Sequence, residues 1–210
     1  MMMKGIFITF EGPDGAGKST QIKKFISYLE EKSYSYKLTR EPGGTELGDH
    51  IRRAVLDPEV GKVDERAETL LYLASRAQHV SQLIRPALED GMIVVCDRFS
   101  DSTMAYQGIA RGLGLENISQ LNDFATGGLL PDITFLLDAD PQKLEERRSR
   151  RRFMDRMELE KGNFQERVRE GFLLLQQQNQ NRIFKLNALD SVGKIRSEII
   201  DVFEKFLEKM

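Results

Sequence analysis

The sequence predicts an α/β fold in which helices cover both faces of a doubly wound parallel β-sheet of about five strands. Short apolar runs alternate along the 210 residues with longer segments whose apolar side chains recur every three or four positions. Polar or glycine residues follow directly after these runs, at Gly12, Arg40, Asp97 and Asp138. Ligands of such sheets bind beyond the carboxyl ends of the strands, so we expect these positions to surround one site.

The expected strands are the short apolar runs, at residues 4–10, 34–39, 92–96, 133–137 and 183–186. The run at 92–96 is continuously apolar, which is typical of a central parallel strand that is covered on both faces. Pro42, Gly43 and Gly44 follow the second run and exclude regular structure there. Each strand is therefore separated from the next by a segment long enough for a helical crossover.

The expected helices cover residues 19–29, 47–56, 64–88, 100–110, 117–125, 143–152, 164–181 and 192–207. The first has apolar side chains at Ile22, Phe25, Ile26 and Leu29, which fall on one helical face. Pro86 lies near the end of the longest and predicts a kink or an early stop there, because proline lacks the N–H that an α-helix needs.

Length and composition favour one globular domain. The formal net charge is -2 with 30% charged residues, so the overall balance gives no reason to expect a nucleic acid or a membrane as partner. Cys96 is the only cysteine, which excludes an internal disulfide and fits a reducing compartment. We see no signal peptide or long apolar span, and we expect a cytoplasmic protein.

Residues 12–19 read GPDGAGKS and match the phosphate-binding P-loop pattern G-x-x-x-x-G-K-[ST], with a strand before and a helix after. Glycines let the loop curl so that successive N–H groups point at phosphate oxygens. Lys18 would reach the terminal phosphates and Ser19 would hold Mg²⁺, whereas a merely structural glycine turn is the alternative. The expected ATP-phosphate site comprises Gly12, Pro13, Asp14, Gly15, Ala16, Gly17, Lys18, Ser19 and Thr20.

Two charged clusters fit a bound triphosphate. Asp97 ends a strand, where a carboxylate can anchor the Mg²⁺ shell through water, and Arg98 beside it can clamp a phosphate; a surface ion pair is the alternative. Six arginines, from Arg147 to Arg156, suggest a lid at about residues 143–158 that closes over the phosphates. A solvated basic face or a nucleic-acid patch is the alternative for this segment.

Tyr72 and Arg76 lie one helical turn apart, so an aromatic ring and a guanidinium share one face and could bind a base. Spacing alone favours ordinary packing beside a solvated charge. His50 and His79 have no partner pattern around them, and we interpret both as structural or exposed.

Several separated motifs occur in one order through nearly the whole chain: EGPDGAGKST, TREPGGT, LLYLASRAQHV, DRFSDSTMAYQG and a closing DRME. This combination closely resembles the thymidylate kinase family. The resemblance implies transfer of the γ-phosphoryl group of ATP to thymidine monophosphate (dTMP), which gives the diphosphate for dTTP synthesis. It also implies Mg²⁺ as cofactor and a homodimer formed by the long helices in the middle of the chain.

The resemblance assigns roles to residues that match the family motifs. Lys18 and Ser19 match residues that hold the donor phosphates and metal, and Arg98 matches one that bridges the transferred phosphoryl group. Tyr72 matches the aromatic that stacks on thymine, and Tyr106 the one beside the deoxyribose. The implied dTMP site comprises Asp14, Arg40, Pro42, Tyr72, Arg76, Arg98, Thr103, Tyr106 and Gln107. A cis peptide bond before Pro42 is also expected.

The family has two arrangements, and Gly15 occupies the position at which the eukaryotic type has an arginine. The sequence therefore resembles the bacterial type, which supplies its catalytic arginine from the lid. Arg147 and Arg151 match that lid pattern, while Ser149 departs from it and the other arginines are extra, so which arginine is catalytic stays open.

Three other functions compete with this interpretation. A kinase for another nucleoside or nucleotide would share the P-loop, the Asp97-Arg98 pair and the lid. A nucleotide-dependent switch is less favoured, because the chain has no N-K-x-D guanine signature. A nucleic-acid-dependent ATPase could use the arginine cluster, but the slightly acidic overall balance disfavours it.

Overall fold

The structure is a computed structural model that describes residues 5–149, 154–160 and 163–209. Its centre is a parallel sheet of five strands: β1 (Ile6–Glu11), β2 (Tyr36–Arg40), β3 (Ile93–Asp97), β4 (Ile133–Asp138) and β5 (Ile183–Asn187). Their spatial order is β2-β3-β1-β4-β5, and each neighbouring pair is parallel. The predicted doubly wound α/β fold is therefore confirmed.

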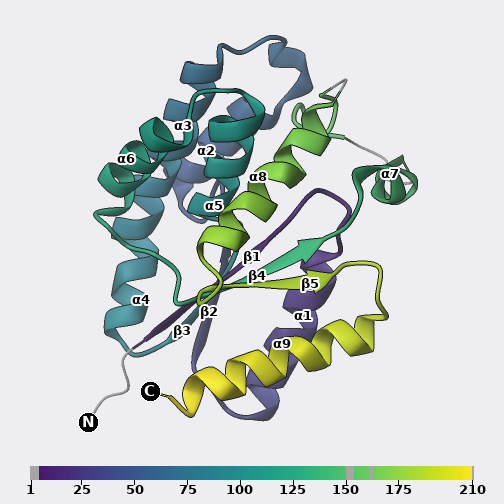
Figure 1. Ribbon diagram of the computed structural model, residues 1–210. Coiled ribbons are helices and arrows are strands. Elements are labelled where there is room, and N and C mark those ends of the chain that lie inside the picture. Colours follow the sequence, from purple (N-terminus) through teal and green to yellow (C-terminus); the bar gives the residue numbers. More distant parts are fainter. Residues whose placement is uncertain (1–4, 150–153, 161–162, 210) are drawn as a thin grey trace.

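Two layers of helices enclose the sheet (Figure 1). Helices α1 (Lys18–Glu31) and α9 (Val192–Leu207) pack together on one face, where the ring of Phe25 contacts both Phe10 of β1 and Phe203 of α9. Successive side chains of a strand point to opposite faces of the sheet, so Phe7 of β1 packs against Phe99 on the other face. Both faces of β1 are thus buried, as its continuous apolar pattern indicates.

The helices of the second layer are α2 (Glu46–Leu56), α3 (Glu65–His79), α4 (Arg85–Glu89), α5 (Ser100–Thr103), α6 (Leu115–Thr126) and α8 (Phe164–Gln178), with a short 3₁₀ turn η1 (Pro58–Val60). Helix α7 (Pro141–Ser149) stands beyond the end of β4 (Figure 1). The side chains of Thr45, Asp64 and Ser191 cap α2, α3 and α9 by accepting backbone N–H groups.

The structure differs from the expected single helix over residues 64–88. Helix α3 continues into a π-helical turn, η2 (Val80–Ile84), before α4 begins. Pro86 lies two residues beyond that turn, and its missing N–H and bulky ring favour a wider local winding over a regular α-helix. The expected early stop does not occur, because the chain stays helical through Glu89.

A second π-helical segment, η3 (Met104–Ala110), extends α5 where a regular helix was expected over residues 100–110. Helix α8 packs closely on η3, because Gly171 has no side chain and a Cβ there would collide with the backbone of Ala105. This contact places Tyr106 and Gln107 at the carboxyl end of the sheet, where β1 and β3 stop.

Candidate functional site

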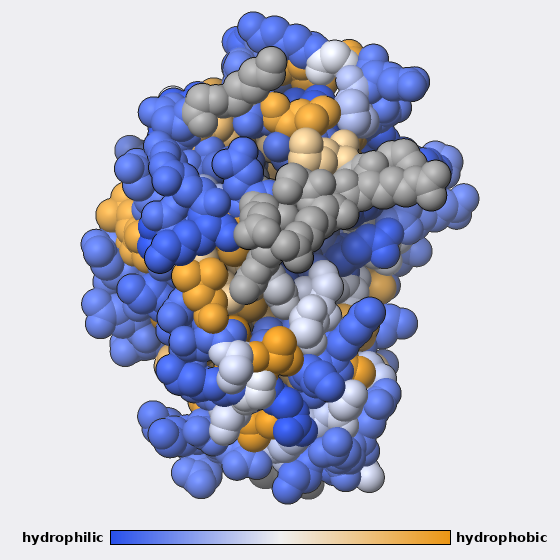
Figure 2. Space-filling model, turned by 90° about the vertical axis from the view of Figure 1, so that its right-hand side faces the viewer, coloured by the Kyte–Doolittle hydropathy of each residue, from blue (hydrophilic) through white to orange (hydrophobic). Residues whose placement is uncertain are grey.

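A cavity of about 570 Å³ lies beyond the carboxyl ends of β1, β2 and β3. Apart from the lid arginines, all residues of the predicted site line it except Gly12 and Pro13. Figure 2, which views the molecule from the side toward which β4 and β5 run, shows a mostly hydrophilic surface with small apolar patches. The residues predicted to bind phosphates and the acceptor therefore come together around one cavity.

The P-loop joins β1 to α1 in the conformation that its glycines permit. Gly12 has φ 129°, and a Cβ there would collide with the carbonyl of Leu137 on the neighbouring strand. Gly17 has φ 94° and immediately precedes α1, so the N-terminus of that helix opens onto the loop. The Nζ atom of Lys18 donates to the carbonyls of Gly12 at 2.9 Å and Pro13 at 3.1 Å. Lysine and helix dipole together create a positive phosphate cradle.

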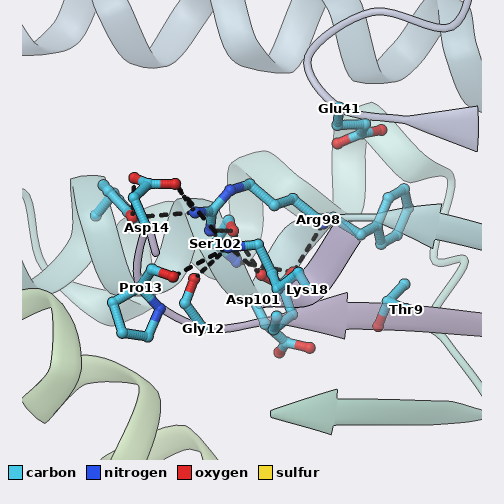
Figure 3. Close-up of polar contacts among 12 residues, drawn as sticks. Thr9, Gly12, Pro13, Asp14, Lys18, Glu41, Arg98, Asp101 and Ser102 are labelled. Carbon is cyan, nitrogen blue, oxygen red and sulfur yellow. Dashed lines mark hydrogen bonds and ion pairs between the residues drawn. The ribbon is translucent and has the colours of Figure 1, made fainter. Parts of the chain in front are cut away.

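Arg98 crosses from the end of β3 to the P-loop, as Figure 3 shows. Its Nη2 atom donates to Asp14 Oδ1 at 2.7 Å and to the hydroxyl of Tyr106 at 3.3 Å, while Nη1 donates to Ser102 Oγ at 3.0 Å. Burial alone would raise the pKa of Asp14, but the charges of Arg98 and Lys18 hold it well below its usual range. Arg98 therefore links the P-loop to α5 and η3 through these bonds, instead of forming a surface ion pair.

Glu11 is a functional candidate that the sequence analysis did not single out, although it stands in the EGPDGAGKST motif. It is fully buried, and its oxygens accept bonds from the Phe99 N–H at 2.7 Å and the Ser102 hydroxyl at 2.6 Å. These bonds fix the turn that holds Arg98 at a φ of 71°, which is unusual for a residue other than glycine. Glu11 thus supports the backbone from which Arg98 projects.

The pH dependence of stability provides a test of this burial. Desolvation, with the nearby Asp101 carboxylate, raises the pKa of Glu11 from 4.5 to about 7. Because the folded pKa is the higher one, the stabilising contribution is complete below about pH 4.5 and is lost as the pH rises through about 7.

We therefore expect the stability of Glu11→Gln, relative to the natural sequence, to improve by about 2–3 kcal/mol from pH 4.5 to pH 8. Urea unfolding of both proteins across this range measures the change. The exposed Glu166→Gln is the matched control, and parallel curves for Glu11→Gln and the natural protein would contradict the prediction.

Tyr72 and Arg76 lie on α3 at the opposite wall, and both line the cavity. The ring of Tyr72 is half-buried, whereas the guanidinium of Arg76 is buried and hydrogen-bonded to other side chains. It pairs with Glu41 at 2.7 Å and donates to Thr103 Oγ1 at 2.9 Å, and it also reaches Asn122. Arg76 is therefore held rigidly at the cavity wall.

Glu41 is a second residue that the sequence analysis missed. It is buried, and it pairs with His79 at 3.0 Å as well as with Arg76. His79 also bonds Thr39 Oγ1 at 2.7 Å, so its interpretation as a structural histidine is confirmed. The peptide bond between Glu41 and Pro42 is cis, as predicted.

Two further arginines, Arg40 and Arg52, line the same cavity. Arg40, half-exposed at the end of β2, pairs with Asp49 at 3.2 Å. Arg52 lines the same cavity and donates to the carbonyl of Pro42 at 3.0 Å, although the sequence analysis did not select it. Each could receive an anionic group of an acceptor.

The residues expected to hold Mg²⁺ suit that ion. The Oδ1 atom of Asp97 is buried without a hydrogen-bond partner among the described residues, and Ser19 lies exposed in the same cavity. Mg²⁺ usually keeps several of its waters when it binds a protein. One hydroxyl and one carboxylate are therefore enough to hold it here, and a cluster of acidic ligands is not needed. Among the residues that the structure describes, no group of three or more potential metal-ligating side chains occurs.

The arginine-rich segment is described in part. Arg147 belongs to α7, and Arg151 lies outside the described residues. Arg156 is buried, donates to Glu68 and to the carbonyl of Val55, and therefore contributes to structure at the base of the segment. The lid as a moving element stays a prediction.

Within the described parts of the chain, no helix combines the length and hydrophobicity needed to cross a membrane. A family model described as Thymidylate kinase matches residues 10–199. The thymidylate kinase of an Exiguobacterium species is 47% identical over 95% of this chain and 94% of its own length. That of Clostridium novyi is 44% identical, over 94% and 98%.

The crystal structure of thymidylate kinase from Ehrlichia chaffeensis superposes with a TM-score of 0.78 at 35% identity, covering 95% of this chain and 98% of the other. The predicted family resemblance is therefore confirmed over the fold as well as the sequence. The chain that carries this P-loop, the Arg98 link and the cavity wall with Tyr72 belongs to the thymidylate kinase family.

Proposed function

We propose that this protein transfers the γ-phosphoryl group of ATP to dTMP, which gives dTDP and ADP in the synthesis of dTTP. The observation that carries the proposal is the single cavity that connects the P-loop to the wall containing Tyr72, with Arg98 between them. Family membership supports the same reaction.

The chemistry needs no strong general base, because the attacking oxygen of dTMP is already anionic at neutral pH. Positioning and charge neutralisation supply the rate instead. Lys18 and the backbone of the P-loop bind the donor phosphates, and Arg98 lies where the two phosphates meet. Arg147 and Arg151 add positive charge from the lid.

On the acceptor side, the proposed contacts follow the cavity wall. Tyr72 stacks on thymine. Thr103, whose Oγ1 atom accepts from Arg76, presents a fixed hydroxyl donor to the base. Tyr106, held against Asp14 and Arg98, faces the deoxyribose. The remaining proposed contacts are Arg40, Pro42 and Gln107, with Arg40 at the acceptor phosphate.

A substrate panel tests this proposal. ADP release should be measured with ATP and Mg²⁺ against dTMP, dUMP, dCMP, AMP, GMP and thymidine. A strong preference for dTMP is expected. Preference for another monophosphate would overturn the thymine pocket while preserving the kinase core, and ADP release without any acceptor would overturn the kinase assignment itself.

Mg²⁺ is the proposed cofactor, held by Ser19 directly and by Asp97 through water. When bound, it neutralises charge on the donor phosphates. We expect Asp97→Asn to raise the Mg²⁺ concentration for half-maximal activity by about tenfold or more, because the amide cannot accept charge-assisted bonds from metal-bound water.

The measurement is a Mg²⁺ titration of kcat at saturating nucleotides, with thermal melting to show that the fold is retained. Asp49→Asn, at a half-exposed carboxylate of α2, is a control for the loss of one negative charge. An unchanged Mg²⁺ requirement in Asp97→Asn would contradict the assignment.

The proposed working form is a homodimer in the cytoplasm, without nucleic acid as partner. Leu121 and Phe124 stand one turn apart on α6 and are 39% and 90% exposed, which is unusual for large apolar side chains so close together.

We expect light scattering to give twice the mass of the chain. Phe124→Glu should yield monomers, whereas Leu38→Glu on β2 should not; a monomeric natural protein would contradict the proposal.

A further inference from the structure

A buried carboxylate behind the acceptor wall joins three separate segments of the chain. Glu68 on α3 has no exposed surface, and both of its oxygens are fully used. Oε1 accepts from Gln107 Nε2 at 2.8 Å and from Arg111 Nε at 3.2 Å. Oε2 accepts from Arg111 Nη2 at 3.0 Å and from Arg156 Nη2 at 2.6 Å. One side chain thus holds η3, Arg111 directly after it, and Arg156 near the end of the predicted lid.

The partners of Glu68 reach the cavity although Glu68 itself is enclosed. Gln107 lines the cavity from η3. Arg156 lies between Asp155 and Met157, which both line the cavity as well. The carboxylate therefore holds two walls of the acceptor end at a fixed separation.

Arg156 is anchored on its other side by the end of α2. Its backbone N–H donates to the carbonyl of Leu56 at 3.0 Å, and its Nε donates to that of Val55 at 2.9 Å. Arg111 pairs in addition with Glu160 and lies over the ring of Phe164, with its Cζ 4.6 Å from the ring centroid. The base of the lid is consequently tied to the acceptor wall by two guanidiniums that share one carboxylate.

The charge of Glu68 is required for this arrangement. Burial alone would raise its pKa, but the hydrogen bonds from Arg111 and Gln107 and the adjacent guanidinium charges hold the pKa below its ordinary value. Without the carboxylate charge, the guanidiniums of Arg111 and Arg156 would lose the anion that they share in the protein interior. A buried charge without its counter-ion costs free energy, which the protein could lower by moving the segments apart. Glu68 therefore bonds both walls directly.

We propose that Glu68 is a positioning residue for the phosphoryl acceptor: through Gln107 and Arg156 it sets the separation between the η3 wall and the segment at residues 155–158. The inference rests on the proposed assignment of this end of the cavity to dTMP. Glu68 does not touch the substrate, so its effect falls on acceptor binding and leaves the donor site, built from the P-loop, unaltered.

The test is the Glu68→Gln variant, which keeps the size of the side chain and removes its charge. We expect KM and Kd for dTMP to rise by about tenfold, with KM for ATP changed by less than about twofold. Steady-state kinetics give the KM values, and calorimetric titration of dTMP gives Kd independently of turnover. Glu65→Gln, one turn earlier on α3, is the matched control and should match the natural protein in both constants.

A lower melting temperature with unchanged KM for dTMP would reduce Glu68 to a structural role and overturn the proposal. Equal rises in both KM values would overturn it as well. If Glu68→Gln does not fold, Arg156→Lys replaces it: the variant keeps a positive charge near Glu68, loses the bond to Val55, and should raise KM for dTMP selectively by a smaller factor. An unchanged KM for dTMP in that variant would count against the proposal equally.

Failure of the proposed function is recognisable separately, because it concerns the natural protein. If the substrate panel selects a different monophosphate, the thymine assignment fails. Glu68 is then tested with that acceptor by the same comparison of KM values and Kd.

Discussion

Replacement of Lys18 by alanine is expected to lower kcat by about 10³-fold or more while the protein stays folded. Lys18 supplies the side-chain positive charge of the P-loop, and no other described lysine lines the cavity. Its hydrogen bonds go to the carbonyls of Gly12 and Pro13, which are close to it in the sequence, so its removal breaks few tertiary contacts.

Burial also explains why the fold should tolerate this change. Desolvation and the neighbouring charge of Arg98 lower the pKa of Lys18 to about 8, which means that the charged amine is held in an unfavourable environment. Removing it relieves that cost. Activity is measured by ADP release and folding by thermal melting, with the exposed Lys24→Ala on α1 as control. A folded Lys18→Ala protein within tenfold of the natural kcat would contradict the prediction.

Replacement of Arg98 by lysine is expected to lower kcat by about 10²–10³-fold although the charge is conserved. The guanidinium makes three bonds at once, to Asp14, Ser102 and Tyr106, and an ammonium cannot reproduce that planar fork. The lysine variant would also lose the cation–π contact of the guanidinium with Tyr106, in which Arg98 Cζ lies 5.3 Å from the ring centroid.

The backbone strain at this position is common to both residues, because arginine and lysine each carry a Cβ at the φ of 71°. The comparison therefore isolates the geometry of the charged group. Kinetics at saturating ATP and dTMP measure the loss, and the exposed Arg53→Lys on α2 is the control. A kcat for Arg98→Lys equal to that of the control would show that charge alone suffices.

Most of the fold could be predicted because its signals are local. The P-loop, the continuous apolar strands and the caps of the helices each depend on residues that are close in sequence. The winding of residues 80–84 and 104–110 was not predictable in this way, since a π-helical turn has no short sequence pattern and depends on packing against neighbouring elements.

The candidate site was predictable as a set of positions but not as a network. Arg98 was expected to bind phosphate, and Gln107 and Arg76 were expected near the base. Their actual partners include Glu11, Glu41 and Glu68, which resembled ordinary charged residues in the sequence. A buried carboxylate is recognisable only when its surroundings are known.

The amino-acid sequence alone predicts a doubly wound parallel sheet with a P-loop after its first strand, and its ordered motifs identify the family. Which charges meet is known from the folded structure. Arg98 and Asp14 are 84 residues apart, Arg156 and Glu68 are 88 apart, and Arg76 and Glu41 are 35 apart. Pairs so distant along the chain depend on how strands and helices pack, because local residue patterns specify single elements and not the neighbours that those elements acquire.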